Sequence, residues 1–459
     1  MLNRYHKYHF IGIGGIGMSG LAEFLNQRGY LVTGSDLTPS ENTARLEKMG
    51  VKIYYGHKVA NLQDVEVVVY TAAISDDNPE LVAARTQGIF TIKRARLLGE
   101  IFRTYPHRIA VSGTHGKTTT TALIGSIFTA AGHDPMIIGG GILPQSNSPV
   151  RIGSGNVIIA EADEFNRSFL QLYPSTAVIT TIEPEHLDCY ASLEDIKTTF
   201  LQFVHQTDNN GAVVICTDEP AVREIQNRIE RSVFSYGINY PADWMAQNIN
   251  LDGNGSSWEV IFRGKKMGVL SLQIPGNHNV KNALAALAVA HQHGVDWQSI
   301  KKGLEQFSGV RRRMEIVAQS PEVILMDDYA HHPTEIKATL TAARQGWHRR
   351  LVAIFQPHLY TRTRDFYLEF SQALALADIV ILLDIYPARE KALPGISSKL
   401  IFDHLIKTKS DGLFYVRTAA EAIEQVLRIF KPGDLIITLG AGNINQILAP
   451  LKTKLIEKQ

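Results

Sequence analysis

The sequence predicts an α/β protein made of three successive domains, and two observations support this. The chain has 459 residues, and a typical domain has about 150. Short apolar runs alternate with amphipathic stretches, and this alternation starts afresh near residue 106 and again after residue 310. Because alternating strands and helices form parallel βαβ units, we expect domains over residues 1–105, 106–310 and 311–459.

The composition excludes some broad classes of protein. Lys and Arg total 46 against 45 for Asp and Glu, which gives a net charge of +1. This balance removes the broad basic field that a general nucleic-acid or anionic-membrane binder needs. With 45% hydrophobic and 20% charged residues, the chain is expected to form sizeable cores and not to be disordered.

Cysteine usage and the N-terminus indicate a cytoplasmic protein. Cys189 and Cys216 are the two cysteines, so neither a disulfide framework nor a CxxC zinc or redox site is expected. The N-terminal stretch MLNRYHKYHFIGIGG predicts a first strand and not a signal peptide. The sequence contains no run of about 18 apolar residues, which a membrane-spanning helix needs. We therefore expect no nucleic-acid partner and no membrane insertion.

The first domain is predicted as a doubly wound parallel sheet. Strands are expected at residues 8–13, 31–34 and 65–70, with a helix over residues 19–28 that ends at Gly29. These short strands are bounded by glycine and polar residues, as in βαβ units.

A glycine-rich loop joins the first predicted strand to the first helix. It contains Gly12, Gly14, Gly15 and Gly17, and Asp36 follows 19 residues after Gly17. Glycines there permit a tight turn and a close approach of a diphosphate to the helix N-terminus. The carboxylate has the spacing of one that binds a ribose hydroxyl, as in NAD sites. The motif identifies a diphosphate-bearing nucleotide more securely than NAD, and the alternative is that the glycines serve only the turn.

The second domain begins with a strand that runs into a phosphate-binding loop. Strands are expected at residues 108–112, 157–160, 177–180 and 211–216, a β-rich segment at 243–274, and a helix over 279–291. The loop consists of Gly113, Thr114, His115, Gly116, Lys117, Thr118 and Thr119. Its backbone N–H groups would hold phosphates, with Lys117 on the β and γ oxygens and Thr118 on Mg²⁺. The usual pattern has glycine six residues before the lysine, where this chain has Val111.

Acidic and histidine side chains follow the next two predicted strands. Glu161-Ala162-Asp163-Glu164 comes after the strand at 157–160, and His186 after the strand at 177–180. Ligand sites in α/β sheets form at the carboxyl ends of strands, where a carboxylate can hold Mg²⁺ on ATP phosphates. His186 alone would be a structural histidine, but its position near the phosphate loop favours a functional role.

The third domain carries polar clusters after its strands, which are expected at residues 323–326, 351–355, 379–383 and 435–439. The segment DDYAHHP, with Asp328 and His331, follows the first strand. A helix N-terminus with Pro333 in its first turn is one explanation, but it leaves the carboxylates and imidazoles unexplained. The arginines at 311–313 form either a solvated patch or a phosphate contact. Arg362 and Arg364 offer guanidiniums for a carboxylate.

Two nucleotide sites in one chain favour an ATP-driven joining enzyme. An NAD-dependent dehydrogenase would use the first loop and leave the phosphate loop without a task. An ATPase-like binding or regulatory module would use the phosphate loop and leave the first loop unexplained. Both remain alternatives from the residues alone.

These motifs occur in the order seen in the Mur ligases, and the chain resembles that family over essentially its whole length. They are GIGGIGMSGLAEFL, SGTHGKTTTT, EADE, EPEHLD, GNHNVKNALAALA, GVRRRME, DDYAHHPTEIKATL, FQPHLYTRTRD and GAGNI. The resemblance implies a Rossmann-like N-terminal domain, a central P-loop ATPase-like domain and a Rossmann-like C-terminal domain. Two departures from the family pattern are Phe165-Asn166 in place of Ser-Asp after EADE, and Leu359 in place of Arg after FQPH.

The resemblance also implies roles for the residues at matching positions. Gly12, Gly14, Gly15, Gly17 and Asp36 would hold the diphosphate part of a UDP-sugar. The loop from Gly113 to Thr119 would bind ATP, with Thr118, Glu161 and His186 on Mg²⁺ ions. Asn279 and Asn282 match an adenine-side motif, Arg313 and Asp328 match ATP contacts, and His331 and Arg362 match positions that face the amino acid. The expected catalytic residues are Lys117, Glu161, His186 and His331.

The reaction implied by the resemblance joins L-alanine to UDP-N-acetylmuramate with consumption of ATP. The muramyl carboxylate attacks the γ-phosphate to give an acyl phosphate and ADP, and the amine of L-alanine then expels phosphate. DDYAHHPTE and FQPH also suit a relative that adds L-Ala-γ-D-Glu-meso-diaminopimelate to the same sugar nucleotide. EPEHLDCY and DIYPAREKALPG favour L-alanine. We expect a monomer or a weak homodimer.

Overall fold

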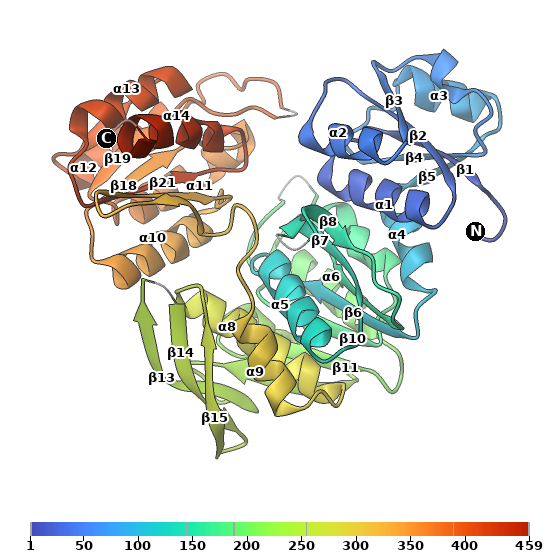
Figure 1. The fold of residues 1–459 in the computed structure, drawn as a ribbon, viewed down its shortest axis with the longest axis horizontal. Helices are drawn as coiled ribbons and strands as arrows, with labels where there is room; N and C mark the ends of the chain where they lie inside the picture. The colour runs from blue at the N-terminus through green and yellow to red at the C-terminus, as the bar shows by residue number, and fades with distance from the viewer. Residues whose placement is uncertain (1, 144–145, 187–188, 254, 389, 458–459) are drawn as a thin grey trace. The chain divides into compact units, whose positions relative to one another are not determined.

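The computed structural model describes residues 2–143, 146–186, 189–253, 255–388 and 390–457 (Figure 1). The chain forms two compact units. One comprises Met1–Gln247, Glu259–Leu270 and Lys281–Phe307, and the other comprises Asn248–Trp258, Ser271–Val280 and Ser308–Gln459. The described residues form three separate sheets. The fold is therefore α/β with mainly parallel strands, as the sequence predicted.

The first sheet has five parallel strands in the order β3-β2-β1-β4-β5. The strands are β1 (Lys7–Ile11), β2 (Leu31–Asp36), β3 (Lys52–Tyr55), β4 (Val67–Tyr70) and β5 (Phe90–Lys93). The helices are α1 (Ile16–Gln27), α2 (Glu41–Lys48), α3 (Pro79–Thr86), α4 (Arg94–Phe102) and the 3₁₀ turn η1 (Val59–Leu62). Because the chain leaves β1 in one direction and returns through β4 on its other side, the sheet is doubly wound and has a switch point beside β1.

Strand β4 shows how the sequence builds this sheet. Val67 and Val69 lie in one hydrophobic core with Leu21 of α1, whereas Val68 lies in a second core with Leu81 of α3. Successive side chains of a strand point to opposite faces, so a continuous apolar run requires cover on both faces. The apolar part of the strand predicted at residues 65–70 therefore lies between two cores.

The second sheet has ten strands in the order β15-β14-β13-β12-β11-β10-β6-β9-β7-β8. The strands are β6 (His107–Ser112), β7 (Met136–Leu143), β8 (Ser148–Arg151), β9 (Val157–Glu161), β10 (Thr176–Ile179), β11 (Ala212–Cys216), β12 (Ser232–Gly237), β13 (Trp244–Asp252), β14 (Gly255–Phe262) and β15 (Lys265–Leu272). The helices are α5 (Lys117–Ala130), η2 (Phe165–Gln171), α6 (Leu193–His205), α7 (Pro220–Gln226), α8 (Asn277–Gln292) and α9 (Trp297–Glu305). Strands β9 and β10 flank β6 and run parallel to it, so their carboxyl ends meet at one edge.

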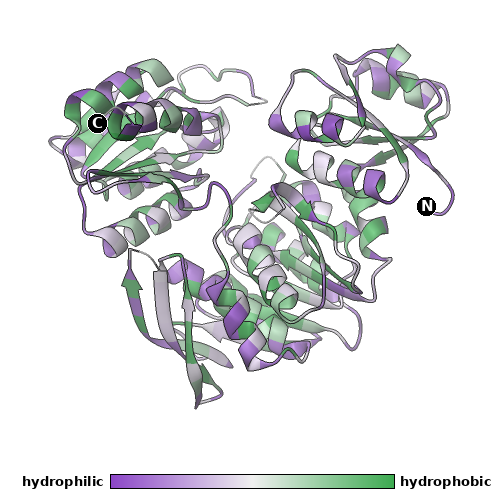
Figure 2. Cartoon of the chain, viewed as in Figure 1, coloured by the Kyte–Doolittle hydropathy of each residue, from purple (hydrophilic) through white to green (hydrophobic). Residues whose placement is uncertain are grey.

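The third sheet has six strands in the order β16-β17-β21-β18-β19-β20, with only β16 antiparallel to its neighbour. The strands are β16 (Glu315–Gln319), β17 (Val323–Asp328), β18 (Leu351–Phe355), β19 (Ile379–Leu382), β20 (Leu413–Tyr415) and β21 (Asp434–Leu439). The helices are α10 (Pro333–Trp347), α11 (Tyr360–Leu374), α12 (Lys399–Thr408), α13 (Ala419–Ile429), α14 (Leu448–Lys452) and the short turns η3 (Ile444–Ile447) and η4 (Thr453–Glu457). Figure 2 shows hydrophobic residues concentrated along the strands of the sheets.

The predicted elements are found, with shifted ends. The first helix begins at Ile16, three residues before the predicted start, because Gly15 has an extended backbone and serves as its N-cap. Seven strands of the described residues were not predicted: β3, β5, β7, β8, β12, β16 and β20. In the part of the chain that the structure describes, no helix is long and apolar enough to cross a bilayer.

Candidate functional site

The glycine-rich loop after β1 is held by the end of β2. The N–H groups of Gly12 and Ile13 donate to the carbonyl of Ser35 at 2.8 and 3.0 Å. The N–H of Gly14 donates to Asp36 Oδ2 at 2.8 Å, and a Cβ on Gly14 would lie 2.9 Å from that oxygen. Asp36 therefore fixes the conformation of the loop. The sequence predicted only a contact between Asp36 and a ribose hydroxyl.

The start of α1 is suited to an anion. Its N-cap is Gly15, which makes no side-chain capping bond, and its first turn is the uncharged Ile16-Gly17-Met18-Ser19. The N-terminus of a helix carries a partial positive charge and N–H groups that point outward. The diphosphate site predicted at this loop is thus chemically reasonable.

The phosphate loop connects β6 to α5 through two glycines in left-handed conformation. Gly113 has φ +137° and Gly116 has φ +82°. A Cβ on Gly113 would lie 2.0 Å from Thr180 Oγ1, and one on Gly116 would lie 2.6 Å from Asn282 Oδ1. Val111 lies inside β6, paired with Val178 of β10 and Glu161 of β9. The position where the usual pattern has glycine is therefore strand in this chain, which explains the departure.

Lys117 is the first residue of α5, and its ammonium group makes four short contacts. Nζ donates to both carboxylate oxygens of Glu164 at 2.9 and 3.0 Å, and to the carbonyls of Gly113 and Thr114 at 2.5 and 3.1 Å. Burial disfavours the charge, but Glu164 and the nearby Asp163 outweigh it and raise the pKa of Lys117. The side chain is therefore a fixed cation at the phosphate loop.

Thr118 and Glu161 come together as the sequence predicted. The Thr118 hydroxyl donates to Glu161 Oε2 at 2.8 Å, and the N–H of Gly140 donates to the same oxygen at 2.8 Å. These are hard oxygen donors, which suit Mg²⁺.

His186 lies in a second cluster with Asp163 and Glu164. One ligand atom of each lies within 4.8 Å of the others, and His186 Nε2 is 3.8 Å from Glu164 Oε1. From the sequence, Glu161 and His186 were expected to bind Mg²⁺, and Glu164 had no expected role. Tyr190 was not expected at this cluster either, and its hydroxyl donates to the Glu164 carbonyl at 2.6 Å. The adjacent carboxylates of EADE were the signal for this cluster.

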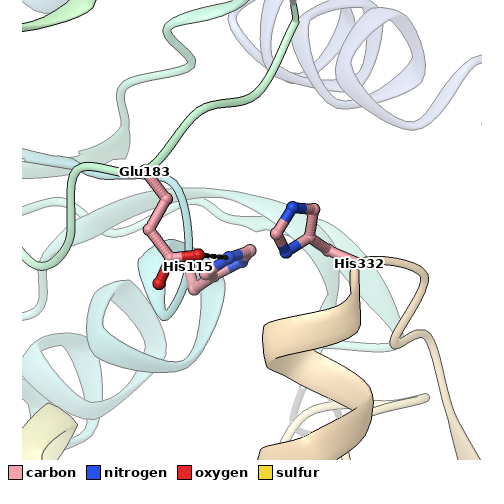
Figure 3. A group of neighbouring side chains, drawn as sticks. All are labelled: His115, Glu183 and His332. Carbon is pink, nitrogen blue, oxygen red and sulfur yellow. Dashed lines mark ion pairs between the residues drawn. The ribbon is translucent and has the colours of Figure 1, made fainter. Parts of the chain in front are cut away.

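His115 of the phosphate loop faces Glu183, a residue that sequence reasoning did not assign. His115 Nε2 lies 3.5 Å from Glu183 Oε2 (Figure 3). The backbone N–H of Glu183 donates to Thr114 Oγ1 at 2.9 Å. The segment after β10 thus supports the phosphate loop through side chain and backbone.

The two asparagines of α8 make different contacts. Asn282 Oδ1 accepts from Thr120 Oγ1 at 3.3 Å and lies beside Gly116, so it belongs with the phosphate loop. Asn279 Nδ2 donates to the carbonyl of Pro275 at 2.7 Å. An adenine contact of either residue stays a prediction.

At the end of β17, Asp328 is buried and fixes the local backbone. Its carboxylate accepts from the N–H groups of Met314 and Ala330 at 2.9 and 2.7 Å. Burial raises the pKa of Asp328 to about 6, against the lowering effect of Arg313. The Arg313 guanidinium lies 5.5 Å from the Tyr329 ring centre and 3.5 Å from Glu335.

His331 and Arg362 lie in one aromatic and basic cluster. The rings of His331 and His358 have centres 6.0 Å apart, and Arg362 Nη1 is 3.3 Å from His358 Nδ1. Arg364 instead pairs with its neighbour Asp365, with 52% of its side chain exposed. His332 is the N-cap of α10 and Pro333 its first residue, so the helix-start explanation holds for those two residues.

Three family descriptions of known proteins match successive parts of this chain. Residues 7–106 match the family described as "Mur ligase family, catalytic domain", residues 111–290 match "Mur ligase middle domain", and residues 312–442 match "Mur ligase, glutamate ligase domain". A UDP-N-acetylmuramate–L-alanine ligase from Geotalea daltonii is 43% identical over 100% of both chains. One from Acetivibrio thermocellus is 44% identical over 97% of this chain and 95% of that protein.

Two solved structures share the fold over nearly the whole chain. The UDP-N-acetylmuramate–alanine ligase of Thermotoga maritima has a TM-score of 0.85 and 29% identity, covering 99% of this chain and 100% of that one. A murein peptide ligase from Psychrobacter arcticus has a TM-score of 0.72 and 26% identity, covering 97% and 98%.

Proposed function

This chain belongs to the Mur ligase family, and we propose that it joins L-alanine to the carboxylate of UDP-N-acetylmuramate in an ATP-dependent reaction. The observation that carries the proposal is the presence of two loops built for phosphate, after β1 and after β6. A ligase that activates a nucleotide-linked acid with ATP needs both. The alanine ligases at 43 and 44% identity support the choice of amine.

In the proposed first step, the phosphate loop places the γ-phosphate of ATP for attack by the muramyl carboxylate. Lys117 neutralises charge on the transferring phosphoryl group, since phosphoryl transfer depends mainly on positioning and charge. Thr118 and Glu161 would hold one Mg²⁺, which neutralises phosphate oxygens when bound. Asp163, Glu164 and His186 offer the donor set for a second ion.

In the proposed second step, the amine of L-alanine attacks the acyl phosphate and phosphate leaves. Arg362 would bind the alanine carboxylate, because a guanidinium matches a carboxylate in two-point contact. His331 would lie on the amine side of that pocket. Asp328 and Arg313 would serve the ATP side, and Asn279 and Asn282 the adenine side.

We also propose three domains over residues 1–105, 106–310 and 311–459, one each for the sugar nucleotide, ATP and the amino acid. A cytoplasmic location and a monomer or weak homodimer complete the proposal. The two phosphate-binding loops argue against an NAD-dependent dehydrogenase, which would leave Lys117 and its acidic partners unused.

Phosphate release with UDP-N-acetylmuramate, ATP, Mg²⁺ and one amine at a time tests the proposal. We expect release with L-alanine and much less with L-Ala-γ-D-Glu-meso-diaminopimelate. Turnover with the tripeptide alone would assign the chain to the function of the murein peptide ligases. Phosphate release that needs no amine would favour an ATPase-like module.

A further inference from the structure

Arg94 lies against the glycine-rich loop although no motif marks it. It is the first residue of α4, directly after β5. A Cβ placed on Gly17 would lie 2.7 Å from Arg94 Nη1, 3.2 Å from Cδ and 3.3 Å from Cζ. The Arg94 side chain therefore covers the first turn of α1 at the position where that helix has glycine.

This contact explains Gly17 better than backbone conformation does. Gly17 lies within α1, where alanine is a stronger helix former than glycine. Gly12, in contrast, has φ +79° and needs glycine for its conformation. Gly17 thus provides room for a guanidinium.

The charge of Arg94 is only loosely balanced. Arg94 Nη2 lies 4.0 Å from Asp163 Oδ2, and 27% of the Arg94 side chain and 40% of the Asp163 side chain are exposed. At that distance the pair is not hydrogen-bonded, and such exposed pairs contribute little. The guanidinium fork therefore adds a full positive charge to the partial charge of the α1 N-terminus.

We propose that Arg94 is a diphosphate-binding residue for the sugar nucleotide, held in place by Gly17. A guanidinium binds phosphate oxygens through two parallel N–H groups, and the α1 N-terminus supplies backbone N–H groups beside it. The ligand class is a nucleoside diphosphate. The identification of that ligand as UDP-N-acetylmuramate rests on the proposed function.

Titration calorimetry of the full-length protein with UDP, without ATP or Mg²⁺, tests the role of Arg94. A lost charge-assisted hydrogen bond weakens binding by roughly ten- to a hundredfold, so we expect that loss in Arg94→Ala. Arg94→Lys should recover part of it, because charge remains without the fork. Uridine, which lacks phosphate, should bind the variants and the unaltered protein equally well.

Arg96→Ala is the matched control. Arg96 lies in the same turn of α4, is exposed, and its guanidinium lies 5.5 Å from the Phe90 ring centre. We expect UDP to bind this variant normally.

Gly17→Ala supplies a second test that does not remove the arginine. The added methyl should displace the guanidinium and weaken UDP binding. In the Arg94→Ala background, Gly17→Ala should not weaken UDP binding any further. Such non-additivity is the signature of two residues acting through one contact.

Unchanged UDP affinity in Arg94→Ala, or an equal loss for uridine, would overturn the role of Arg94. Failure of the unaltered protein to bind UDP would instead contradict the proposed function and the ligand together. Should Arg94→Ala fail to fold, as judged by its melting temperature, Arg94→Lys and Gly17→Ala decide the question.

Discussion

Lys117 is the residue on which the proposed phosphoryl transfer depends most. Its ammonium group is fixed by Glu164 and two loop carbonyls. We expect Lys117→Ala to lower ADP formation by at least about a hundredfold, as when a charge aimed at the transition state is removed. UDP binding should remain normal, because the glycine-rich loop belongs to another sheet. Lys301→Ala, which alters a lysine of α9 with 45% of its side chain exposed, is the charge-matched control. Full turnover in Lys117→Ala would refute the assignment.

The two arginines of α11 allow a direct comparison of amino-acid binding. Arg362 is buried beside His358, whereas Arg364 is exposed and paired with Asp365. Arg362→Ala should raise the KM for L-alanine by roughly ten- to a hundredfold, the cost of a lost charge-assisted bond, with little change in the KM for ATP. Arg364→Ala should change neither constant. Equal effects of the two substitutions in steady-state kinetics would contradict the assignment to Arg362.

The sequence predicted which residues form the candidate site better than it predicted which of them contact one another. The pairing of Thr118 with Glu161 follows from two strands that end at one edge. The cluster of His186 with Asp163 and Glu164 depends on the left-handed conformation of His186, φ +55°. Nothing in the spacing of the motifs indicates that conformation. Arg94 was missed for a related reason, since its contact with Gly17 is purely tertiary.

At the scale of elements, a buried polar network fixes α3 to β1 and β2. Glu80 is fully buried and accepts from Ser35 Oγ and Asn61 Nδ2, both at 2.5 Å, and His9 Nε2 lies 3.5 Å away. Burial alone would raise the pKa of Glu80, but the nearby His9 imidazole and the hydrogen bonds from Ser35 and Asn61 outweigh burial and lower the pKa to about 2. Ser35 also holds the glycine-rich loop through its carbonyl.

This network predicts a pH dependence of stability. The folded pKa of Glu80 is about 2 and the unfolded value is 4.5. Its contribution of about 3 kcal/mol is therefore present above pH 4.5 and is lost as the pH falls from 4.5 toward 2. Glu80→Gln should lower the melting temperature at pH 7, and the difference from the unaltered protein should narrow below pH 4.5. Glu41→Gln, which alters an exposed carboxylate of α2, is the control, and a difference that stays constant with pH would contradict this role.

Strands formed by a continuous apolar run were predictable, whereas β7, β8, β12, β16, β20 and the edge strands of the first sheet were not. The runs VVVY, VIIA and LVAIF in β4, β9 and β18 are apolar, and each of these strands was predicted within about two residues. Strands β3 (KIYY) and β5 (FTIK) are the edge strands of the first sheet. Their residues are mostly half-buried or exposed, so the apolar signal that marks a central strand is weak.

In the whole molecule, two restarts of the strand and helix pattern, near residues 106 and 310, predicted three α/β units, and the described residues form three sheets. The grouping into two compact units was not predictable. One hydrophobic core runs from Tyr8 of the first sheet to Phe203 of α6, and Ser148 Oγ donates to Glu23 Oε2 of α1 at 2.6 Å. Such contacts join residues more than a hundred positions apart, which local patterning does not report.

The net charge of the chain is only +1, yet positive charge is concentrated where phosphate or carboxylate groups are expected to bind. Positive charge is placed at the phosphate loop, at the glycine-rich loop and in α11, where Lys117, Arg94 and Arg362 lie. Backbone N–H groups at the starts of α1 and α5 add to it. A phosphate-handling enzyme therefore does not need the broad basic surface of a nucleic-acid binder.

In the proposed reaction, ATP cleavage is coupled to the formation of an amide on the muramyl carboxylate. The most direct measurement combines mass spectrometry of the sugar nucleotide with quantification of ADP after reaction with ATP, Mg²⁺ and L-alanine. We predict that UDP-N-acetylmuramate gains one alanine for each ADP formed, and that omission of either substrate stops both. ADP formed without the alanine adduct, or an adduct formed without ATP, would contradict the proposed coupling.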